Sequence, residues 1–210
     1  MNCAIIGYGE LGRQLHAFIK EQYAPATTFF LDDGCFERDE PNAFPFNSYM
    51  DERFADCAFF IGLGYRQLAA KATVLQQLQA AGRQLPSLVH PTAWVAPTAQ
   101  IGEAVYVYPM SNIDKNVVLQ PGALLNNTVT VSHDSVVGSC AYLSPGVVLC
   151  GFTQVGSGSF VGAGAVVANN VSIGQEVVAG IGSIITQNIP DGAHCIGNPL
   201  KILNKPIKLT

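Results

Sequence analysis

The chain has little charge for its size. Only 12% of its 210 residues are Asp, Glu, Lys or Arg, whereas 49% are hydrophobic. A chain with so little charged surface is expected to bury part of that surface against copies of itself. The formal net charge of −4 also argues against nucleic acid or an anionic membrane as a partner.

Other absences narrow the class of protein further. No apolar run is long enough to span a membrane, and the N-terminal MNCAIIGYGE is too polar and glycine-rich for a signal peptide. The six cysteines form no CxxC pair, which favours reduced thiols in a cytoplasmic protein over disulfides or a metal site. The length leaves room for one or two domains.

What the chain does contain is an uninterrupted repeat of six residues. A period of six fits neither a helix nor an alternating strand that ends in a hairpin, but it is typical of a parallel β-helix built from hexapeptides. The first column of the repeat is apolar at seventeen consecutive positions: Val89, Val95, Ile101, Val107, Ile113, Leu119, Leu125, Val131, Val137, Leu143, Leu149, Val155, Val161, Val167, Ile173, Ala179 and Ile185.

A second column, four residues after the first, holds mostly small residues such as Ala93, Ser111 and Ser159. In such a solenoid three hexapeptides make one triangular coil, so residues eighteen apart stack on successive coils. The apolar column then fills the interior, and the small column lies where the chain turns. We expect between five and six coils over 86–190 with no inserted loop, followed by a capping tail at 191–210.

The first 85 residues have a different pattern, which predicts an α/β domain. Strands at Cys3–Ile6, Thr28–Leu31 and Cys57–Ile61 alternate with two helices, which implies a small parallel, Rossmann-like sheet. The expected buried helix faces are Leu11, Leu15, Phe18 and Ile19 in the first helix and Leu68, Ala72, Leu75 and Leu78 in the second. Residues 35–56 are interpreted as a loop with little regular structure.

A glycine motif in this domain indicates a phosphate site. Gly7, Gly9 and Gly12 follow the first strand and open a helix, the context in which backbone N–H groups hold a pyrophosphate. Asp32 and Asp33 end the next strand, where a ribose or base contact is expected. A domain of this size is too small for a full dinucleotide site, which favours a single nucleotide diphosphate over NAD. Arg13 and Arg66 either neutralise phosphates or lie in solvent.

His133 is the one histidine within the repeat array, and Asp134 follows it. The stacking rule places Lys115 one coil below His133 and Gly151 one coil above it. A base beside a free backbone donor suits acyl transfer, because one removes a proton and the other stabilises an oxyanion. The alternative is an ordinary surface histidine.

A further stacked column loses its side chains towards the end of the array. Its members are Tyr108, Asn126, Ser144, Gly162 and Gly180. The glycines either leave room for an extended ligand or serve the geometry of the turn.

The glycine motif, the aspartate pair and the His133–Asp134 pair lie within a set of six characteristic segments. These segments are IIGYGELG, FLDDG, FIGLGYR, LVHPTAWVAPTAQIG, NNTVTVSHDSVVG and IPDGAHCIGNPLK. Together they resemble the sialic-acid O-acetyltransferase family of left-handed β-helix transferases. That family includes N-acetyltransferases of nucleotide-linked 4-amino sugars of the bacillosamine and perosamine type. The similarity covers nearly the whole chain.

The resemblance implies a left-handed coil, a homotrimer, acetyl-CoA in the groove between adjacent β-helices, a nucleotide sugar on the N-terminal domain, and no metal. It implies that His133 is the general base, that Asp134 orients it, that Gly151 donates to the tetrahedral intermediate and that Asn126 lines the acceptor site. The residues expected at the nucleotide sugar are Gly7, Gly9, Glu10, Leu11, Gly12, Asp32, Asp33, Gly62 and Arg66. Those expected at acetyl-CoA are Tyr142, Gly162, Ala163, Gly180, Ile181 and Lys201. The chain departs from the family at Leu11 and Tyr142, where the family often has histidine.

The sequence therefore predicts an acetyl-CoA-dependent N-acetyltransferase that acts on the 4-amino group of a nucleotide-linked 4-amino-6-deoxy sugar. A sugar O-acetyltransferase and an inactive nucleotide-sugar-binding scaffold are the alternatives. A β-helix zinc enzyme would need three converging histidines, and a dinucleotide-linked oxidoreductase would need a larger domain. Asp32 and Asp33 suit uracil or guanine equally.

Overall fold

A computed structural model describes residues 1–207. The chain divides into two compact units, Met1–Pro86 and the chain from Ser87 onward, and each is described by itself.

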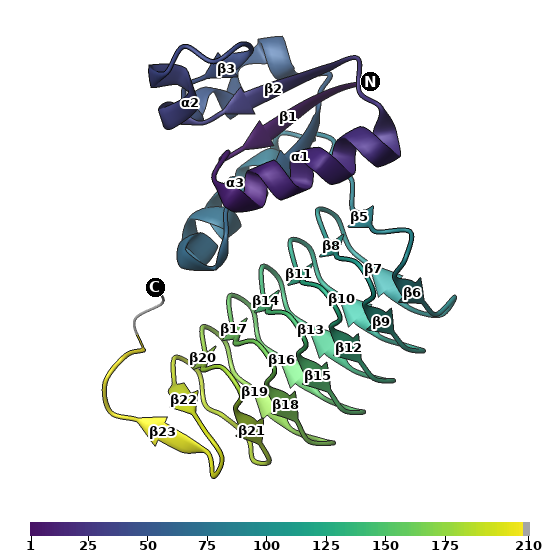
Figure 1. Cartoon of the computed structure of the whole chain (residues 1–210), viewed down its shortest axis with the longest axis vertical. Coiled ribbons are helices and arrows are strands. Elements are labelled where there is room, and N and C mark those ends of the chain that lie inside the picture. Colours follow the sequence, from purple (N-terminus) through teal and green to yellow (C-terminus); the bar gives the residue numbers. More distant parts are fainter. Residues whose placement is uncertain (208–210) are drawn as a thin grey trace. The chain divides into compact units, whose positions relative to one another are not determined.

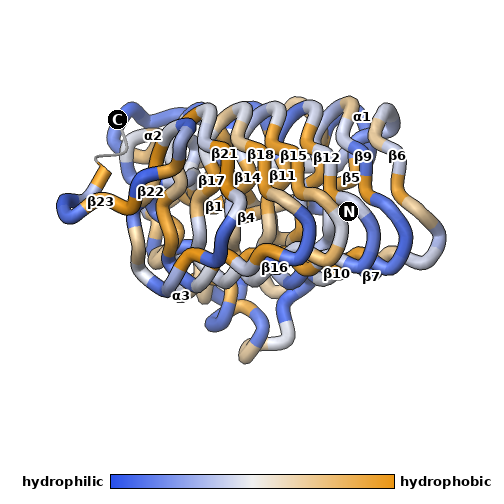
Figure 2. The backbone as a smooth tube through the Cα atoms, turned by 90° about the horizontal axis from the view of Figure 1, so that it is seen from below, coloured by the Kyte–Doolittle hydropathy of each residue, from blue (hydrophilic) through white to orange (hydrophobic). Residues whose placement is uncertain are grey.

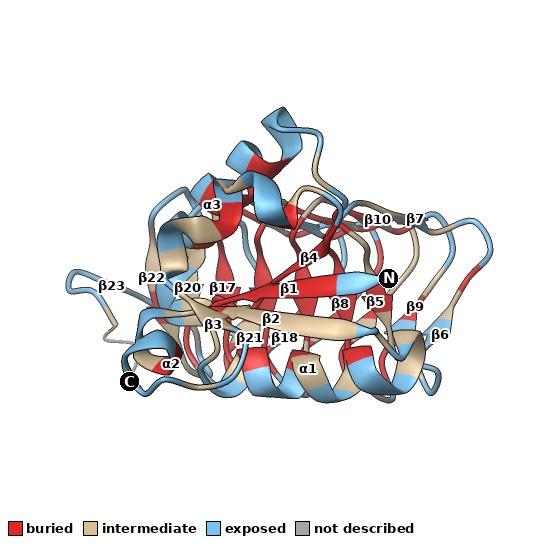
Figure 3. Ribbon diagram, turned by 90° about the horizontal axis from the view of Figure 1, so that it is seen from above, coloured by how far each residue is buried: buried red, intermediate tan, exposed pale blue. Residues whose placement is uncertain are grey.

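The first unit is a four-stranded parallel sheet with the strand order β3-β2-β1-β4 (Figure 1). Its strands are β1 (Asn2–Ile6), β2 (Thr27–Leu31), β3 (Ala43–Phe44) and β4 (Ala58–Ile61). Its α-helices are α1 (Glu10–Tyr23), α2 (Asp33–Glu37) and α3 (Leu68–Ala80), and short 3-10 helices span Phe46–Met50, Glu52–Phe54 and Tyr65–Gln67. Strands β1 and β4 are buried over nearly their whole length (Figure 3).

The segment 35–56, expected to be a loop, is largely regular. It holds the end of α2, all of β3 and two of the 3-10 helices. β3 pairs with β2 at its two residues, and the ring of Phe44 contacts those of Phe29 and Phe54 at centroid distances of 6.0 and 5.2 Å. The expectation was wrong because a two-residue strand is too short for the alternation that marks strands in a sequence.

The buried face of α3 is also rotated from the expected one. Its buried residues are Lys71, Val74, Leu75 and Leu78, whereas Leu68 and Ala72 are only half-buried. A pattern of apolar residues does not predict that Lys71 is buried, because lysine counts as polar although its long hydrocarbon stem packs like an apolar side chain.

The second unit is a parallel-strand solenoid of the left-handed β-helix type, with about six turns. Residues eighteen apart pair, as in Leu125↔Leu143, which confirms the predicted coil. The first face contains β5 (Leu88–Val89), β8 (Tyr106–Val107), β11 (Leu124–Leu125), β14 (Tyr142–Leu143), β17 (Phe160–Val161), β20 (Val178–Ala179), β22 (His194–Ile196) and β23 (Lys201–Leu203). The second contains β6 (Trp94–Val95), β9 (Asn112–Ile113), β12 (Thr130–Val131), β15 (Val148–Leu149), β18 (Val166–Val167) and β21 (Ile184–Ile185). The third contains β7 (Gln100–Ile101), β10 (Val118–Leu119), β13 (Val136–Val137), β16 (Gln154–Val155) and β19 (Ser172–Ile173).

The apolar column forms the interior of this solenoid. From Val107 to Ile185 every member of the column is at most 2% exposed. Figure 2 shows the hydrophobic colour recurring at the strands of successive coils. Hydrophobic burial along the axis therefore holds the coils together.

Each turn of the solenoid contains one residue in the left-handed backbone region. From Ala104 to Gly182 every sixth residue has a φ between 51° and 76°. The N–H of these residues commonly donates to a carbonyl of the preceding coil, as in Asp134 N–H to the Lys115 carbonyl at 3.0 Å. The turn conformation is thus held by a bond between coils.

The solenoid continues past the point where the sequence pattern ends. β22 pairs in parallel with β20, and β23 then pairs with β22 in the antiparallel sense. Of the segment 191–210, expected to be a capping tail, residues 208–210 lie outside the described part.

Serines in the small column link successive coils. Buried Ser159 donates its hydroxyl to the Gly174 carbonyl at 2.7 Å and accepts from the Val177 N–H at 3.0 Å. Ser111 and Ser135 accept in the same way from the residue eighteen positions later.

We expect Ser159→Ala to lower the free energy of unfolding by about 1–3 kcal/mol, because it leaves a buried N–H and a buried carbonyl without their partner. Urea unfolding followed by far-UV circular dichroism measures the change. Ser157→Ala, in the same turn and only half-buried, is the matched control. Equal stabilities of the two variants would contradict the role of this hydroxyl.

Candidate functional site

The turns between the second and third faces, here called the second corner, hold His133, Asp134 and Gly151, three of the four predicted catalytic residues. His133 and Asp134 lie in the turn between β12 and β13. His133 Nδ1 is 2.9 Å from Asp134 Oδ2, and the two side chains are 40% and 31% exposed. The structure therefore brings the predicted base and its acidic partner into direct contact, at a position open to solvent.

The Asp134 carboxylate has a second partner. The amide of Asn116, one coil below, donates to Asp134 Oδ1 at 2.9 Å. This bond, followed by the one from His133, holds the pKa of Asp134 below its ordinary value. The carboxylate is thus kept charged and fixed from two directions.

Gly151 provides the space for the His133 ring. A Cβ on Gly151 would lie 2.7 Å from His133 Cε1 and 2.8 Å from Nε2. The ring of the next residue, Phe152, meets the imidazole edge to face, with centroids 5.2 Å apart at 88°. The imidazole therefore packs against bare backbone and one aromatic ring.

The Gly151 N–H has no hydrogen-bond acceptor among the residues that the structure describes, and the same is true of Ala163 and Ile181. These three residues occupy equivalent positions in their turns, so a free N–H at this position is a general feature of the turn and is not specific to Gly151. Gly151 differs because an imidazole from the coil below lies against it.

The residues expected at acetyl-CoA, and Asn126 from the expected acceptor site, lie elsewhere in the coil. Turns between the first and second faces form the first corner, which holds Asn126, Gly162, Ala163, Gly180 and Ile181, with Tyr142 on the adjoining β14 and Lys201 on β23. Within one chain the second face separates this group from His133.

Packing inside the protein explains the glycines of the first corner. A Cβ on Gly162 would lie 2.6 Å from the Ile181 nitrogen, and one on Gly180 would lie 2.6 Å from Ile196 Cδ1. Both spaces are therefore filled, which favours turn and packing geometry over an open track. Asn126 donates from Nδ2 to Tyr142 Oη at 3.0 Å.

In the first unit, the glycines of the loop separate into two kinds. A Cβ on Gly12 would lie 2.2 Å from the Gly7 carbonyl oxygen, and one on Gly62 would lie 2.3 Å from the same atom. These glycines pack against one another. A Cβ on Gly9 meets nothing within 4 Å, and α1 begins after Gly9 with no side-chain cap.

The two aspartates at the end of β2 bind backbone rather than facing solvent freely. Asp32 accepts from Tyr8 N–H at 2.8 Å and Cys35 N–H at 3.0 Å, and Asp33 accepts from Phe46 N–H at 2.8 Å. Burial alone would raise the pKa of Asp32, but these N–H donors outweigh it and lower the pKa. Asp32 therefore fixes the glycine loop to the end of β2.

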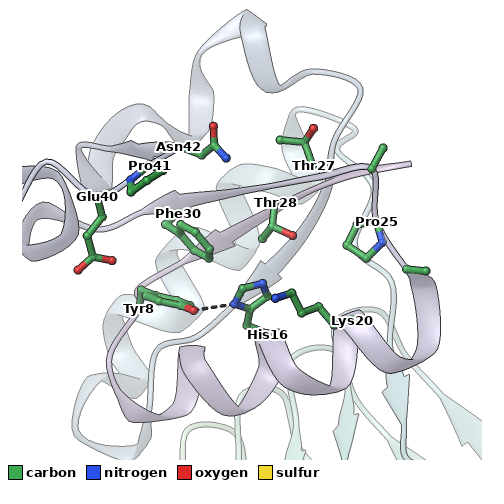
Figure 4. Close-up of a pocket in the computed structure, with 12 residues that line it drawn as sticks. Tyr8, His16, Lys20, Pro25, Thr27, Thr28, Phe30, Glu40, Pro41 and Asn42 are labelled. Atoms are coloured by element: carbon green, nitrogen blue, oxygen red, sulfur yellow. Dashed lines mark hydrogen bonds between the residues drawn. The ribbon is translucent and has the colours of Figure 1, made fainter.

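A cavity of about 630 Å³ in this unit was not expected from the sequence (Figure 4). It lies between α1 and β2, and its lining includes Tyr8, His16 and Phe30. Tyr8 Oη is 2.6 Å from His16 Nδ1, and burial together with Lys20 lowers the pKa of His16. The predicted glycines and aspartates do not line it; Leu11 and Glu10 lie at the start of α1, and Arg66 lies beside the Tyr65 ring.

Across residues 1–207, no three His, Cys, Asp or Glu side chains gather in a way that could hold a metal ion. No helix in that range is both long and apolar enough to cross a bilayer. All six cysteines are free thiols.

We expect Asp32→Ala to lower the free energy of unfolding at pH 7 by about 1–3 kcal/mol, since two backbone N–H groups lose their acceptor. Because the folded pKa of Asp32 is lowered, its contribution is present above about pH 4 and is lost as the pH falls through that folded value. Urea unfolding at pH 7 and at a series of acidic pH values should show the gap to wild type closing. Glu37→Ala, exposed on α2, is the control; a gap that stays constant with pH would contradict the role of the carboxylate.

No protein-family model matches the chain. Among solved structures, the acetyltransferase domain of PglB from Neisseria gonorrhoeae in complex with acetyl coenzyme A is 28% identical, with a TM-score of 0.87 over 96% of this chain and 98% of that one. PerB from Caulobacter crescentus in complex with CoA and GDP-perosamine is 25% identical, with a TM-score of 0.86 over 97% and 98%. WeeI from Acinetobacter baumannii, 22% identical with a TM-score of 0.85 over 97% and 100%, shows likeness of fold alone. The PglB structure is an acetyltransferase domain and the PerB structure holds CoA and GDP-perosamine, and the chain is an acyltransferase with the left-handed β-helix fold that it shares with them.

Proposed function

We propose that the chain transfers an acetyl group from acetyl-CoA to the 4-amino group of a nucleotide-linked 4-amino-6-deoxy sugar. The observation that carries the proposal is the His133–Asp134 pair, with its imidazole against the side-chain-free Gly151. The solved complexes of similar proteins with acetyl-CoA, and with CoA and GDP-perosamine, support the choice of both substrates.

The proposed reaction is a direct transfer. His133 takes a proton from the neutral sugar amine as the amine nitrogen forms a bond to the thioester carbonyl carbon. The Gly151 N–H donates to the oxyanion that develops on this carbonyl. When the oxyanion collapses, the C–S bond breaks and the protonated His133 returns its proton to the sulfur, so that CoA leaves as the thiol. Asp134 accepts from His133 Nδ1–H, which leaves Nε2, the atom next to Gly151, as the base.

The nucleotide diphosphate is proposed to bind at the start of α1. The helix has 14 residues and no side-chain cap, so its first N–H groups and its dipole favour an anion. Gly9 has no packing contact that requires a glycine, whereas close approach of a phosphate would require one. Arg13 extends from the same turn.

The active site is proposed to form between copies of the chain in a homotrimer. The residues expected at acetyl-CoA lie on the first corner and the catalytic pair on the second, so the first corner of one copy must face the second corner of another. Exposed large apolar residues support such a contact. They flank the second face: Met110 and Ile181 on the first corner, Trp94 on the face and Phe152 on the second corner, each at least 53% exposed.

A panel of UDP- and GDP-linked 4-amino-6-deoxy sugars with acetyl-CoA, followed by release of free thiol, tests the function. We expect turnover with at least one amino sugar and a loss of kcat of about 10²- to 10⁴-fold in His133→Asn, because the base is removed. His90→Asn, outside the proposed site, is the control. Absence of turnover with every amino sugar of the panel would contradict N-acetylation.

Mixing two inactive variants tests the shared site. His133→Asn damages only the second corner, and Ala163→Glu with Ile181→Glu damages only the first. In randomly mixed homotrimers about one quarter of the sites combine two intact corners, so co-expression should restore about that fraction of the wild-type rate. Size-exclusion chromatography with light scattering checks the assembly. If each site lay within one chain, the mixture would stay inactive.

A further inference from the structure

Beyond the catalytic pair, we infer that Asn116 is a positioning residue, which acts by fixing the Asp134 carboxylate that orients His133. The inference rests on the proposed function, in that His133 is taken as the base. It starts from the column of side chains at the left-handed position of the second corner. Asn116, Asp134 and Phe152 occupy this position on three successive coils, with φ of 57°, 58° and 59°.

The surroundings of Asp134 are unequal on its two sides. Below it, the Asn116 amide donates to Oδ1 at 2.9 Å; above it lies Phe152, whose ring offers no polar atom. In its own turn, Asp134 Oδ2 faces His133. The charged or titratable groups that act on the carboxylate are His133 and Lys115, and the bond from Asn116 is the largest cause of its lowered pKa.

The backbone of Asn116 is itself held in place. Its N–H donates to Thr98 Oγ1, one coil below, at 3.0 Å. Its side chain therefore starts from a fixed point, and the chain of contacts runs from Thr98 through Asn116 and Asp134 to the imidazole. With one carboxylate oxygen held by Asn116, the other is aimed at Nδ1, which keeps the Nδ1–H tautomer and leaves Nε2 unprotonated as the base.

The simpler explanation of Asn116 is that asparagine tolerates the left-handed turn. Asn170 provides the comparison, because it lies at the same position of the second corner with a φ of 62° and is also exposed. No described residue shares a hydrogen bond with its side chain, so the turn requirement is present there without the carboxylate. Glycine satisfies the turn at both positions and removes only the amide.

The test compares Asn116→Gly with Asn170→Gly. For Asn116→Gly we expect kcat to fall about tenfold, the effect of one hydrogen bond to a charged group, with both KM values within about twofold of wild type. Loss of the donor raises the pKa of Asp134, so the fall in rate on the acid side should begin at higher pH in this variant. Asn170→Gly should keep the wild-type kcat and pH profile. Equal kcat values in the two variants, or a loss in Asn116→Gly that merely follows a lower Tm, would overturn the inference.

A readout without turnover separates this inference from the proposed function. The ¹⁵N shifts of the His133 imidazole report its tautomer, and we expect predominantly Nδ1–H in wild type and in Asn170→Gly, but a mixture in Asn116→Gly. An unchanged tautomer in Asn116→Gly would overturn the positioning role. If no sugar is turned over but the tautomer shifts, the positioning by Asn116 stands and the proposed substrate falls.

Discussion

The structure of the second unit depends on the parallel hydrogen bonding between residues eighteen apart. Because the coils from Leu88 to Ile185 bond to one another with an unchanged register, each turn position inside this range has two fixed neighbours, one coil below and one above. A site on such a solenoid is therefore a set of adjacent columns. The column Lys115–His133–Gly151 supplies the imidazole and its space, and the neighbouring column Asn116–Asp134–Phe152 supplies its partners.

Because the coils stack in a fixed register, glycines at different positions of the solenoid have different structural roles. At Gly162 the next coil's backbone occupies the space of a side chain, so any larger residue would push two coils apart. At Gly151 the space is occupied by a side-chain ring, which moves far more easily than backbone. A glycine of the first kind serves stability, whereas one of the second kind decides where an imidazole lies. The two kinds of glycine are told apart only by the atoms that an added Cβ would meet.

The solenoid could be predicted from the sequence because its period is a whole number of residues and no insertion interrupts it. Counting by eighteen places Gly151 above His133, and the bond from Phe152 N–H to the His133 carbonyl confirms that stacking. The first unit has no such period, which is why β3 was not found. Nor does a sequence show which way a carboxylate points: Asp32 has the position of a ligand contact, but backbone N–H groups already occupy it.

Phe152 shows how turn strain and site geometry can be separated. A bulky residue in the left-handed region costs about 1–2 kcal/mol, which by itself suggests selection for a role. Met110 and Cys140 have the same conformation without contacting the catalytic pair, so the bonds between coils are enough to hold such residues in place. The conformation of Phe152 is therefore a property of the solenoid. What distinguishes Phe152 is its edge-to-face contact with His133, an interaction of about 0.5–1.5 kcal/mol. That contact and the bare backbone of Gly151 thus pack against the same imidazole whose Nδ1 is 2.9 Å from Asp134 Oδ2.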